Sequence, residues 1–144
     1  MKRNRFLMLF IGIVLITLMG CAKDSALVFS KVDLTKVDGK IKIFLDKCTD
    51  KNGIYLYDDN TNENYIFLND YHVKQGEKAS YFENIKMDIQ GTALIIKLDE
   101  QSTNNYKNKK IDNRLLYKVK KPKNIRYIKI YKNGEESKFD LIGN

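Results

Sequence analysis

The spacing of apolar and polar residues predicts one helix early in the chain. Between residues 34 and 48, apolar residues recur every three or four positions, which places them on one face of a helix. These residues are Leu34, Val37, Ile41, Phe44, Leu45 and Cys48. Asp33 or Thr35 could cap the start of this helix. Gly39 weakens the helix prediction, and the alternation of Ile41, Ile43 and Leu45 would suit a strand. The longer periodicity favours a helix near residues 35–48.

From Gly53 onward the pattern changes to an alternation of apolar and polar residues, which is typical of strands. The expected strands span residues 54–57, 65–68, 85–89, 93–98, 115–119, 125–131 and 138–142. Asn133-Gly134 is a residue pair that favours a type I′ turn, so we expect the last two strands to form a hairpin. Gln90-Gly91-Thr92 separates two strands in the same way. About seven strands and one helix predict a mainly β (α+β) domain: an antiparallel sheet, a small sandwich or a barrel.

Tyrosines alternate with aliphatic residues in the first expected strand. Tyr55 and Tyr57 should face away from Ile54 and Leu56, and in a later strand Tyr127 and Tyr131 should face away from Ile128 and Ile130. If both faces of the sheet are covered, these tyrosines belong to the core. If one face is open, they form an aromatic patch.

A different pattern precedes this domain. Lys2, Arg3 and Arg5 are followed by an apolar stretch of thirteen residues, 6–18, and the next charge is Lys23. This order is typical of an export signal. A membrane-spanning helix needs about 20 apolar residues, so a signal peptide fits better than a permanent anchor. The seventeen uncharged residues from 6 to 22 leave an uncleaved N-terminal helix as the alternative.

The apolar stretch ends in Leu18-Met19-Gly20-Cys21, which resembles the lipobox of bacterial lipoprotein precursors. The resemblance implies cleavage between Gly20 and Cys21 and a diacylglyceryl group on the Cys21 thiol. Two acyl chains anchor a protein stably, whereas one chain holds it only marginally. Residues 1–20 would then be the signal peptide, residues 21–25 the lipidated N-terminus and a short tether, and residues 26–144 a single domain outside the cell membrane.

The layout and the richness in Lys, Asn and Ile also resemble small lipoproteins of low-GC Gram-positive bacteria. This second resemblance carries no catalytic or binding residue across to the chain.

The positive charge is concentrated in one part of the sequence. The whole chain has a net charge of +8. Residues 107–132 carry +10 and the expected signal, residues 1–20, carries +3, whereas residues 21–106 carry −3 and residues 133–144 carry −2. An exported basic segment predicts an anionic lipid surface or a cell-wall polyanion as partner, rather than nucleic acid. An ordinary solvated lysine-rich face explains the same residues. The predicted patch comprises Lys107, Lys109, Lys110, Arg114, Lys118, Lys120, Lys121 and Lys123.

Few residues offer catalytic chemistry. His72 is the only histidine, which excludes a histidine-rich metal cluster. Cys48 with His72 is the sole possible Cys–His pair once Cys21 is lipidated. We expect no contact between them, because Cys48 lies on the apolar helix face and is predicted to be a buried small hydrophobe.

The stretch from Tyr57 to Tyr65 begins like a calcium-binding loop, with Asp58, Asn60 and Asn62 at alternate positions. The later positions of that motif do not carry its glycine or its closing acid. A hairpin loop explains the same residues, because Asn and Asp tolerate turn conformations. No cofactor or metal is predicted.

The sequence therefore predicts a membrane-anchored surface lipoprotein with a non-enzymatic binding or interaction domain at the cell envelope. One alternative is an envelope folding factor or an enzyme without histidine or metal chemistry. The other is an immunity or inhibitor lipoprotein.

Overall fold

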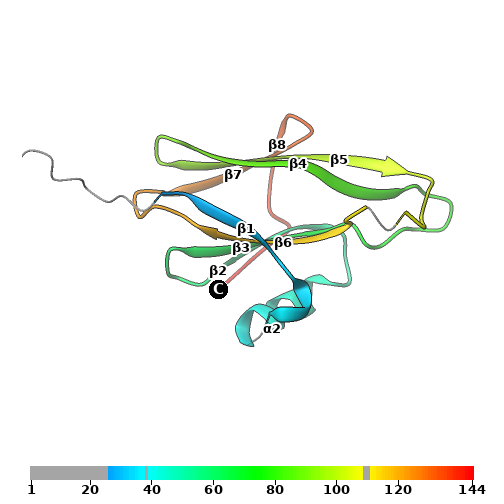
Figure 1. Cartoon of the computed structure of the whole chain (residues 1–144), viewed down its shortest axis with the longest axis horizontal. Helices are drawn as coiled ribbons and strands as arrows, with labels where there is room; N and C mark the ends of the chain where they lie inside the picture. The colour runs from blue at the N-terminus through cyan, green and yellow to red at the C-terminus, as the bar shows by residue number, and fades with distance from the viewer. Residues whose placement is uncertain (1–25, 38, 109–110) are drawn as a thin grey trace, which may run out of the picture.

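The computed structural model describes residues 26–37, 39–108 and 111–144. In this part of the chain, two β-sheets pack face to face and one α-helix lies against the outer face of the larger sheet (Figure 1). The prediction of a mainly β domain is confirmed. Of the three predicted arrangements, a single sheet, a sandwich and a barrel, the structure has the sandwich. The described residues form nine strands rather than about seven.

The larger sheet has five strands in the order β1-β6-β3-β2-β9. Their bounds are Val28–Val32 for β1, Arg114–Lys120 for β6, Glu63–Asn69 for β3, Gly53–Asp58 for β2 and Leu141–Gly143 for β9. The smaller sheet has the order β4-β5-β7-β8. Its strands span Ala79–Gln90, Ala93–Thr103, Tyr127–Lys132 and Glu135–Ser137. Neighbouring strands are antiparallel except β2 with β9 and β5 with β7, which are parallel. The sheets are therefore mixed, because the chain crosses between them before β7 and before β9.

The Asn133-Gly134 turn forms as predicted, but its second arm is the short strand β8 and not the expected strand 138–142, whose last residues pair with β2. Both residues have positive φ, 53° and 85°, as a type I′ turn requires. They join β7 to β8, where Lys132 pairs with Glu135. The predicted strand 138–142 is wrong in its first three residues, which cross to the larger sheet. The crossing is fixed at Asp140, whose backbone N–H donates to the Ile54 carbonyl oxygen at 2.7 Å.

Two helical pieces occupy the region of the single predicted helix. A short 3₁₀ helix, η1, spans Leu34–Lys36 and is capped by Asp33, whose carboxylate accepts the Thr35 N–H at 2.9 Å. The α-helix, α2, spans Gly39–Cys48. The prediction of one helix near residues 35–48 is confirmed, but the α-helix starts only at Gly39, because Val37 is extended (ψ 145°) and Gly39 has a φ of 53°. The predicted apolar face is confirmed, and its residues are Leu34, Val37, Ile41, Phe44, Leu45 and Cys48.

The larger sheet is buried on both faces. Between the sheets lies a core that includes Ile66, Leu94 and Ile96, each at most 1% exposed. Under the helix lies a second cluster, in which Tyr55 and Tyr57 pack with residues of α2 and of the neighbouring strands. Tyr55 and Tyr57 are therefore core residues, whereas Tyr127 is 60% exposed and Tyr131 is half-buried.

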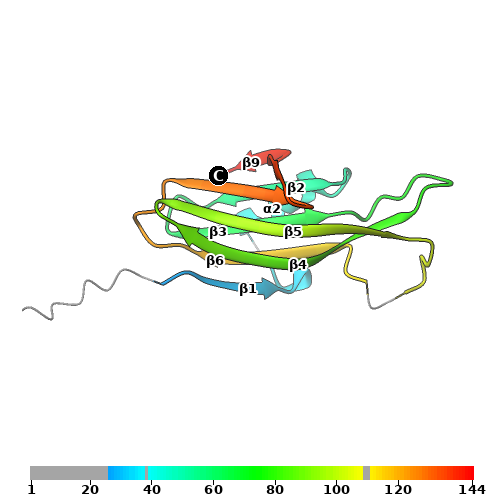
Figure 2. The ribbon, with the colours of Figure 1, turned by 90° about the horizontal axis from the view of Figure 1, so that it is seen from above.

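The sandwich has two distinct ends. At one end β1 begins, with Val28 paired to Lys120, the last residue of β6. The loops that join β2 to β3, β4 to β5 and β6 to β7 lie at this end, which is on the left in Figures 1 and 2. We call it the N-terminal end. At the opposite end, called the distal end, β2 and β4 begin and β3, β5 and β7 finish.

Candidate functional site

A polar cleft of about 330 Å³ opens between the two sheets at the distal end. We call it the distal cleft. Its walls come from strand ends that are far apart in sequence: the start of β2, the end of β3, the start of β4, the ends of β5 and β7, and the link between β8 and β9. The charged side chains that line it are Asp70, Glu100, Lys132, Lys138 and Asp140.

Asp70 is held in the cleft by its backbone and by its neighbour in sequence. Its N–H donates to the Asn113 carbonyl oxygen at 2.7 Å. The buried Asn69 amide donates to the carbonyl oxygens of Cys48 and Lys51, at 3.1 and 2.8 Å, and so joins the end of β3 to the residues at and after the end of α2. These bonds leave the Asp70 side chain in the cleft wall, where the residue is only 6% exposed.

The environment of the Asp70 carboxyl group disfavours its ionised form. Burial raises its pKa to about 7, and the nearby Glu100 carboxylate adds to the rise, while Lys132 acts in the opposite direction. Its Oδ2 atom is buried and accepts no hydrogen bond from any residue that the structure describes. The cleft therefore contains a buried carboxyl oxygen without a hydrogen-bond donor among the described residues, and the nearby Lys132 offsets its electrostatic cost only in part.

Glu100 and Lys132 form an ion pair in the cleft wall. The Lys132 ammonium lies 2.6 Å from Glu100 Oε2, and both side chains are partly exposed. The turn after β7 fixes this geometry, because the Asn133 side-chain oxygen accepts the Glu100 N–H at 2.8 Å. The Asn133 N–H in turn donates to the Leu98 carbonyl oxygen at 3.0 Å. Lys132 is therefore engaged by Glu100.

Asp140 closes the side of the cleft next to β2. Its Oδ2 atom accepts the Ile54 N–H at 2.7 Å. Gly53 makes room for this contact, since a Cβ atom at position 53 would lie 2.6 Å from Asp140 Oδ2. The site thus presents three carboxyl groups and two lysines, of which Lys132 is engaged by Glu100. The excess of carboxyl groups suits a positively charged or hydrogen-donating group. No group of three or more His, Cys, Asp or Glu side chains in the described ranges is arranged to hold a metal ion.

The predicted basic patch is divided between the two ends of β6. Arg114 lies at the distal end, with its guanidinium carbon 4.4 Å from the centre of the Tyr71 ring. Lys120 lies about 20 Å away at the other end of the strand. Lys107 is exposed in the loop before β6, and Lys109 and Lys110 lie outside the described residues.

Two of the patch lysines are paired with acids. The Lys118 ammonium lies 2.8 Å from Glu63 Oε2, and this hydrogen bond raises the lysine pKa. The Lys121 ammonium donates to Asn64 Oδ1 at 2.8 Å and lies 3.8 Å from Asp58 Oδ2.

Three basic residues remain together at the N-terminal end. Lys120, Lys123 and Arg126 are exposed, and none makes an ion pair within the part of the chain that the structure describes. Beside them lies the start of β1, where Val28 and Phe29 are 57% and 39% exposed. This end therefore combines free positive charge with exposed apolar side chains. We call these five residues the basic end.

Cys48 and His72 do not form a pair. Cys48 is 1% exposed, and burial raises the pKa of its thiol to about 11. The His72 ring bonds to the Thr49 carbonyl oxygen, and the His72 backbone exchanges two hydrogen bonds with the Asn52 side chain. No hydrogen bond joins Cys48 to His72 among the described contacts, so these residues serve the packing of the loop against the end of α2.

The segment from Asp58 to Asn64 is a hairpin loop, as expected. Asp58 pairs with Asn64 across β2 and β3. Within the loop the Asp59 carboxylate accepts the N–H and the hydroxyl of Thr61, at 2.9 and 2.6 Å. Asn60 has a φ of 60°, which Asn tolerates in turns.

Gly20 and Cys21, the predicted cleavage and lipid-attachment residues, lie outside the described residues. None of the helices in the described ranges is long and apolar enough to cross a membrane. Comparison with known proteins gave no match to any protein-family model, curated protein or solved structure.

The distal cleft was not predictable from the sequence. Its one local signal was the polar pair Asn69-Asp70 directly after an apolar strand, a pattern that also suits an ordinary loop. Asp70 meets Glu100 and Lys132 only through the packing of the two sheets, which the periodicity of single strands does not specify.

Proposed function

We propose that the chain is the precursor of a membrane-anchored lipoprotein whose β-sandwich is a non-enzymatic binding domain at the outer face of the cell membrane. The diacylglyceryl anchor would be attached to Cys21. The observation that carries the proposal is the pairing of Val28 with Lys120. Because the chain enters the sandwich at Val28, an anchor on Cys21 and the basic end would lie on the same side of the domain.

The tether between anchor and domain would be short. Only four residues, 22–25, separate Cys21 from Ala26, and an extended chain of that length reaches about 15 Å. The basic end would therefore stay close to the lipid headgroups. Each Lys or Arg near an anionic leaflet contributes about 1 kcal/mol. Val28 and Phe29 would add apolar contact beside these charges.

The anchor is tested by changing Cys21→Ser in the full-length chain. Because the thiol is the group that would be acylated, we expect the variant to lose labelling by a fatty-acid analogue and to remain unprocessed. Labelled protein that persists in the membrane fraction after this change would contradict the lipid-anchor proposal. An unlabelled and unprocessed wild type in the membrane fraction would instead favour the uncleaved N-terminal helix.

The basic end is tested separately by flotation with vesicles. The protein is the chain from residue 21 carrying Cys21→Ser, so that neither the lipid nor the signal contributes. We expect more protein on anionic than on neutral vesicles. The triple change Lys120→Gln, Lys123→Gln and Arg126→Gln should weaken anionic binding by about 3 kcal/mol, roughly a hundredfold.

A matched triple change serves as the control: Lys40→Gln, Lys47→Gln and Lys51→Gln. These three lysines are exposed, lie on or just after α2 and do not belong to the basic end. The control variant removes the same net charge and should keep most of the binding. Equal losses in the two triple variants would show that only the net charge matters, and the basic end would then have no special role.

A further inference from the structure

The Asp70 carboxyl group lacks the partner that its position calls for. It is 6% exposed, yet its Oδ2 atom accepts no hydrogen bond from the residues that the structure describes. Nearly all buried polar groups in folded proteins are hydrogen-bonded, so an exception requires an explanation. A carboxyl group in the wall of an open cleft can be completed by a bound ligand.

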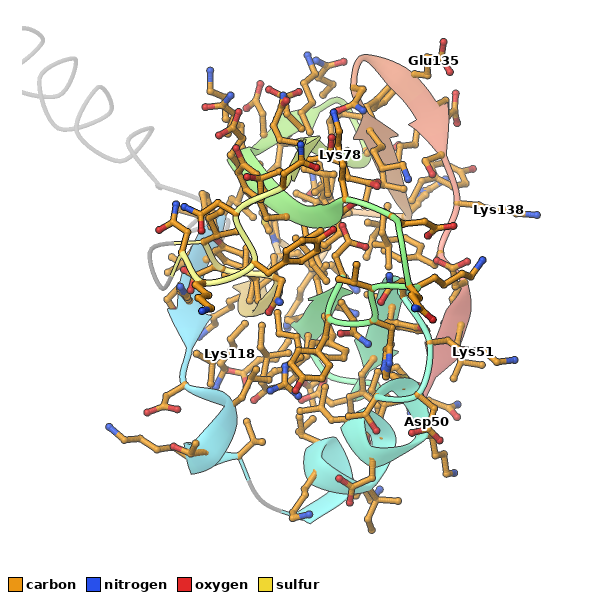
Figure 3. All side chains as sticks on the ribbon, turned by 90° about the vertical axis from the view of Figure 1, so that its right-hand side faces the viewer. Asp50, Lys51, Lys78, Lys118, Glu135 and Lys138 are labelled. Atoms are coloured by element: carbon orange, nitrogen blue, oxygen red, sulfur yellow. The ribbon has the colours of Figure 1, made fainter. Side chains whose placement is uncertain are left out.

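The charges around Asp70 favour a cation. Glu100 on β5 and Lys132 on β7 act on it electrostatically, and Asp140, in the link between β8 and β9, lines the same cleft. Lys132 is already bound by Glu100 at 2.6 Å. Lys138, the other lysine at the cleft, points away from the body of the protein in Figure 3. Burial and the Glu100 carboxylate raise the Asp70 pKa, and Lys132 counteracts this rise only in part.

We propose that the distal cleft binds a small organic cation through its protonated amine, with the Asp70 carboxylate as the principal partner and Glu100 as a second acceptor. The absence of a metal-holding group of side chains in the described ranges disfavours a metal ion. An anionic ligand would be repelled by the carboxylates of the cleft, which outnumber its lysines. This proposal goes beyond the membrane anchor and does not depend on it.

The experiment uses the full-length protein in a neutral detergent, titrated by calorimetry with 1,4-diaminobutane. The matched neutral probe is 1,4-butanediol, which has the same length and hydroxyl groups in place of the ammonium groups. We expect heat of binding for the diamine and none for the diol. Affinity for the diamine should rise between pH 6 and pH 8, because Asp70 ionises there while the diamine remains charged.

Two variants locate the site. Asp70→Asn keeps the shape of the side chain and removes its charge, so it should lower diamine affinity at least tenfold and abolish the rise with pH. Asp50→Asn is the control, since Asp50 is an exposed acid outside the cleft (Figure 3). Its affinity should stay within about twofold of the wild type.

Three results would overturn the proposal: no diamine binding by the wild type, equal binding of diol and diamine, or equal affinity in wild type and Asp70→Asn. Circular dichroism first establishes that the variants are folded. If Asp70→Asn does not fold, Glu100→Gln takes its place and should weaken diamine binding. Unchanged affinity in that variant would also overturn the proposal. Fatty-acid labelling is not a readout here, so failure of the cleft and failure of the anchor remain distinguishable.

Discussion

The stability of the domain should fall as pH rises from about 4 to about 7. In this range the Asp70 carboxyl group is ionised in the unfolded chain but protonated in the folded protein. Its ordinary pKa is 3.8, and in the folded protein burial and Glu100 raise the pKa to about 7. Between these values the folded state holds a proton that the unfolded state has released. The free energy of unfolding therefore decreases with pH across this window and is lowest, as far as Asp70 is concerned, above about pH 7.

The magnitude follows from the size of the shift. One bound proton of difference corresponds to a slope of about 1.4 kcal/mol per pH unit. Over the interval from 3.8 to about 7, the full penalty is about 4 kcal/mol. Such a loss is a large part of the 5 to 15 kcal/mol that typically stabilises a domain.

The assay is urea unfolding of the chain from residue 21 carrying Cys21→Ser, at a series of pH values from 4 to 8. The protein has no tryptophan and nine tyrosines, so tyrosine fluorescence and far-UV circular dichroism are the signals. The same series is measured for Asp70→Asn. The difference between the two curves isolates Asp70, since His72 and the other carboxyl groups are common to both proteins.

We expect the variant to gain stability relative to the wild type as pH increases, with the difference levelling off above about pH 7. A difference curve that is flat from pH 4 to pH 8 would refute the reasoning. So would a wild type that gains stability relative to the variant with rising pH, because the sign would then be that of a carboxylate stabilised by a positive partner.

Three further predictions concern packing. Leu116→Ala removes a fully buried side chain between α2 and the larger sheet and should lower the free energy of unfolding by about 2 to 5 kcal/mol, measured by urea denaturation. Gly143→Ala places a Cβ atom 2.6 Å from the Phe44 ring and should cost about 1 to 3 kcal/mol; the loss should shrink in a Phe44→Leu background. The Cys48 thiol should react with Ellman's reagent slowly in the native protein and quickly in urea, because it is buried and its pKa is raised to about 11; rapid native labelling would contradict this burial.

Local patterns in the sequence predicted local structure well. The three-and-four spacing identified the buried face of α2, including Phe44 and Cys48. The pair Asn133-Gly134 predicted its turn, because the conformation that it adopts is a property of those two residues. The strand β1 was missed, since it is an edge strand of mostly exposed residues without a clear alternation.

Long-range features were not predictable in the same way. The arm after Asn133-Gly134 divides between two sheets because the backbone and side chain of Asp140 bond to Ile54, a residue eighty-six positions earlier. The distal cleft depends on the same kind of contact. No spacing within a single strand indicates that Asp70 will lie near Glu100 and that Lys132 will pair with Glu100.

The two ends of the sandwich should act as electrostatically independent sites. The β3 strand, seven residues long, runs from the N-terminal end to the cleft and so separates the basic end from Asp70 by about 20 Å. At physiological ionic strength charges are screened over about 8 Å, so this separation exceeds two screening lengths. Removing Lys120, Lys123 and Arg126 would then leave the diamine affinity of the cleft unchanged, while Asp70→Asn would leave vesicle binding unchanged. An anchored domain resting on its basic end would hold the cleft away from the membrane, open to ligands in solution.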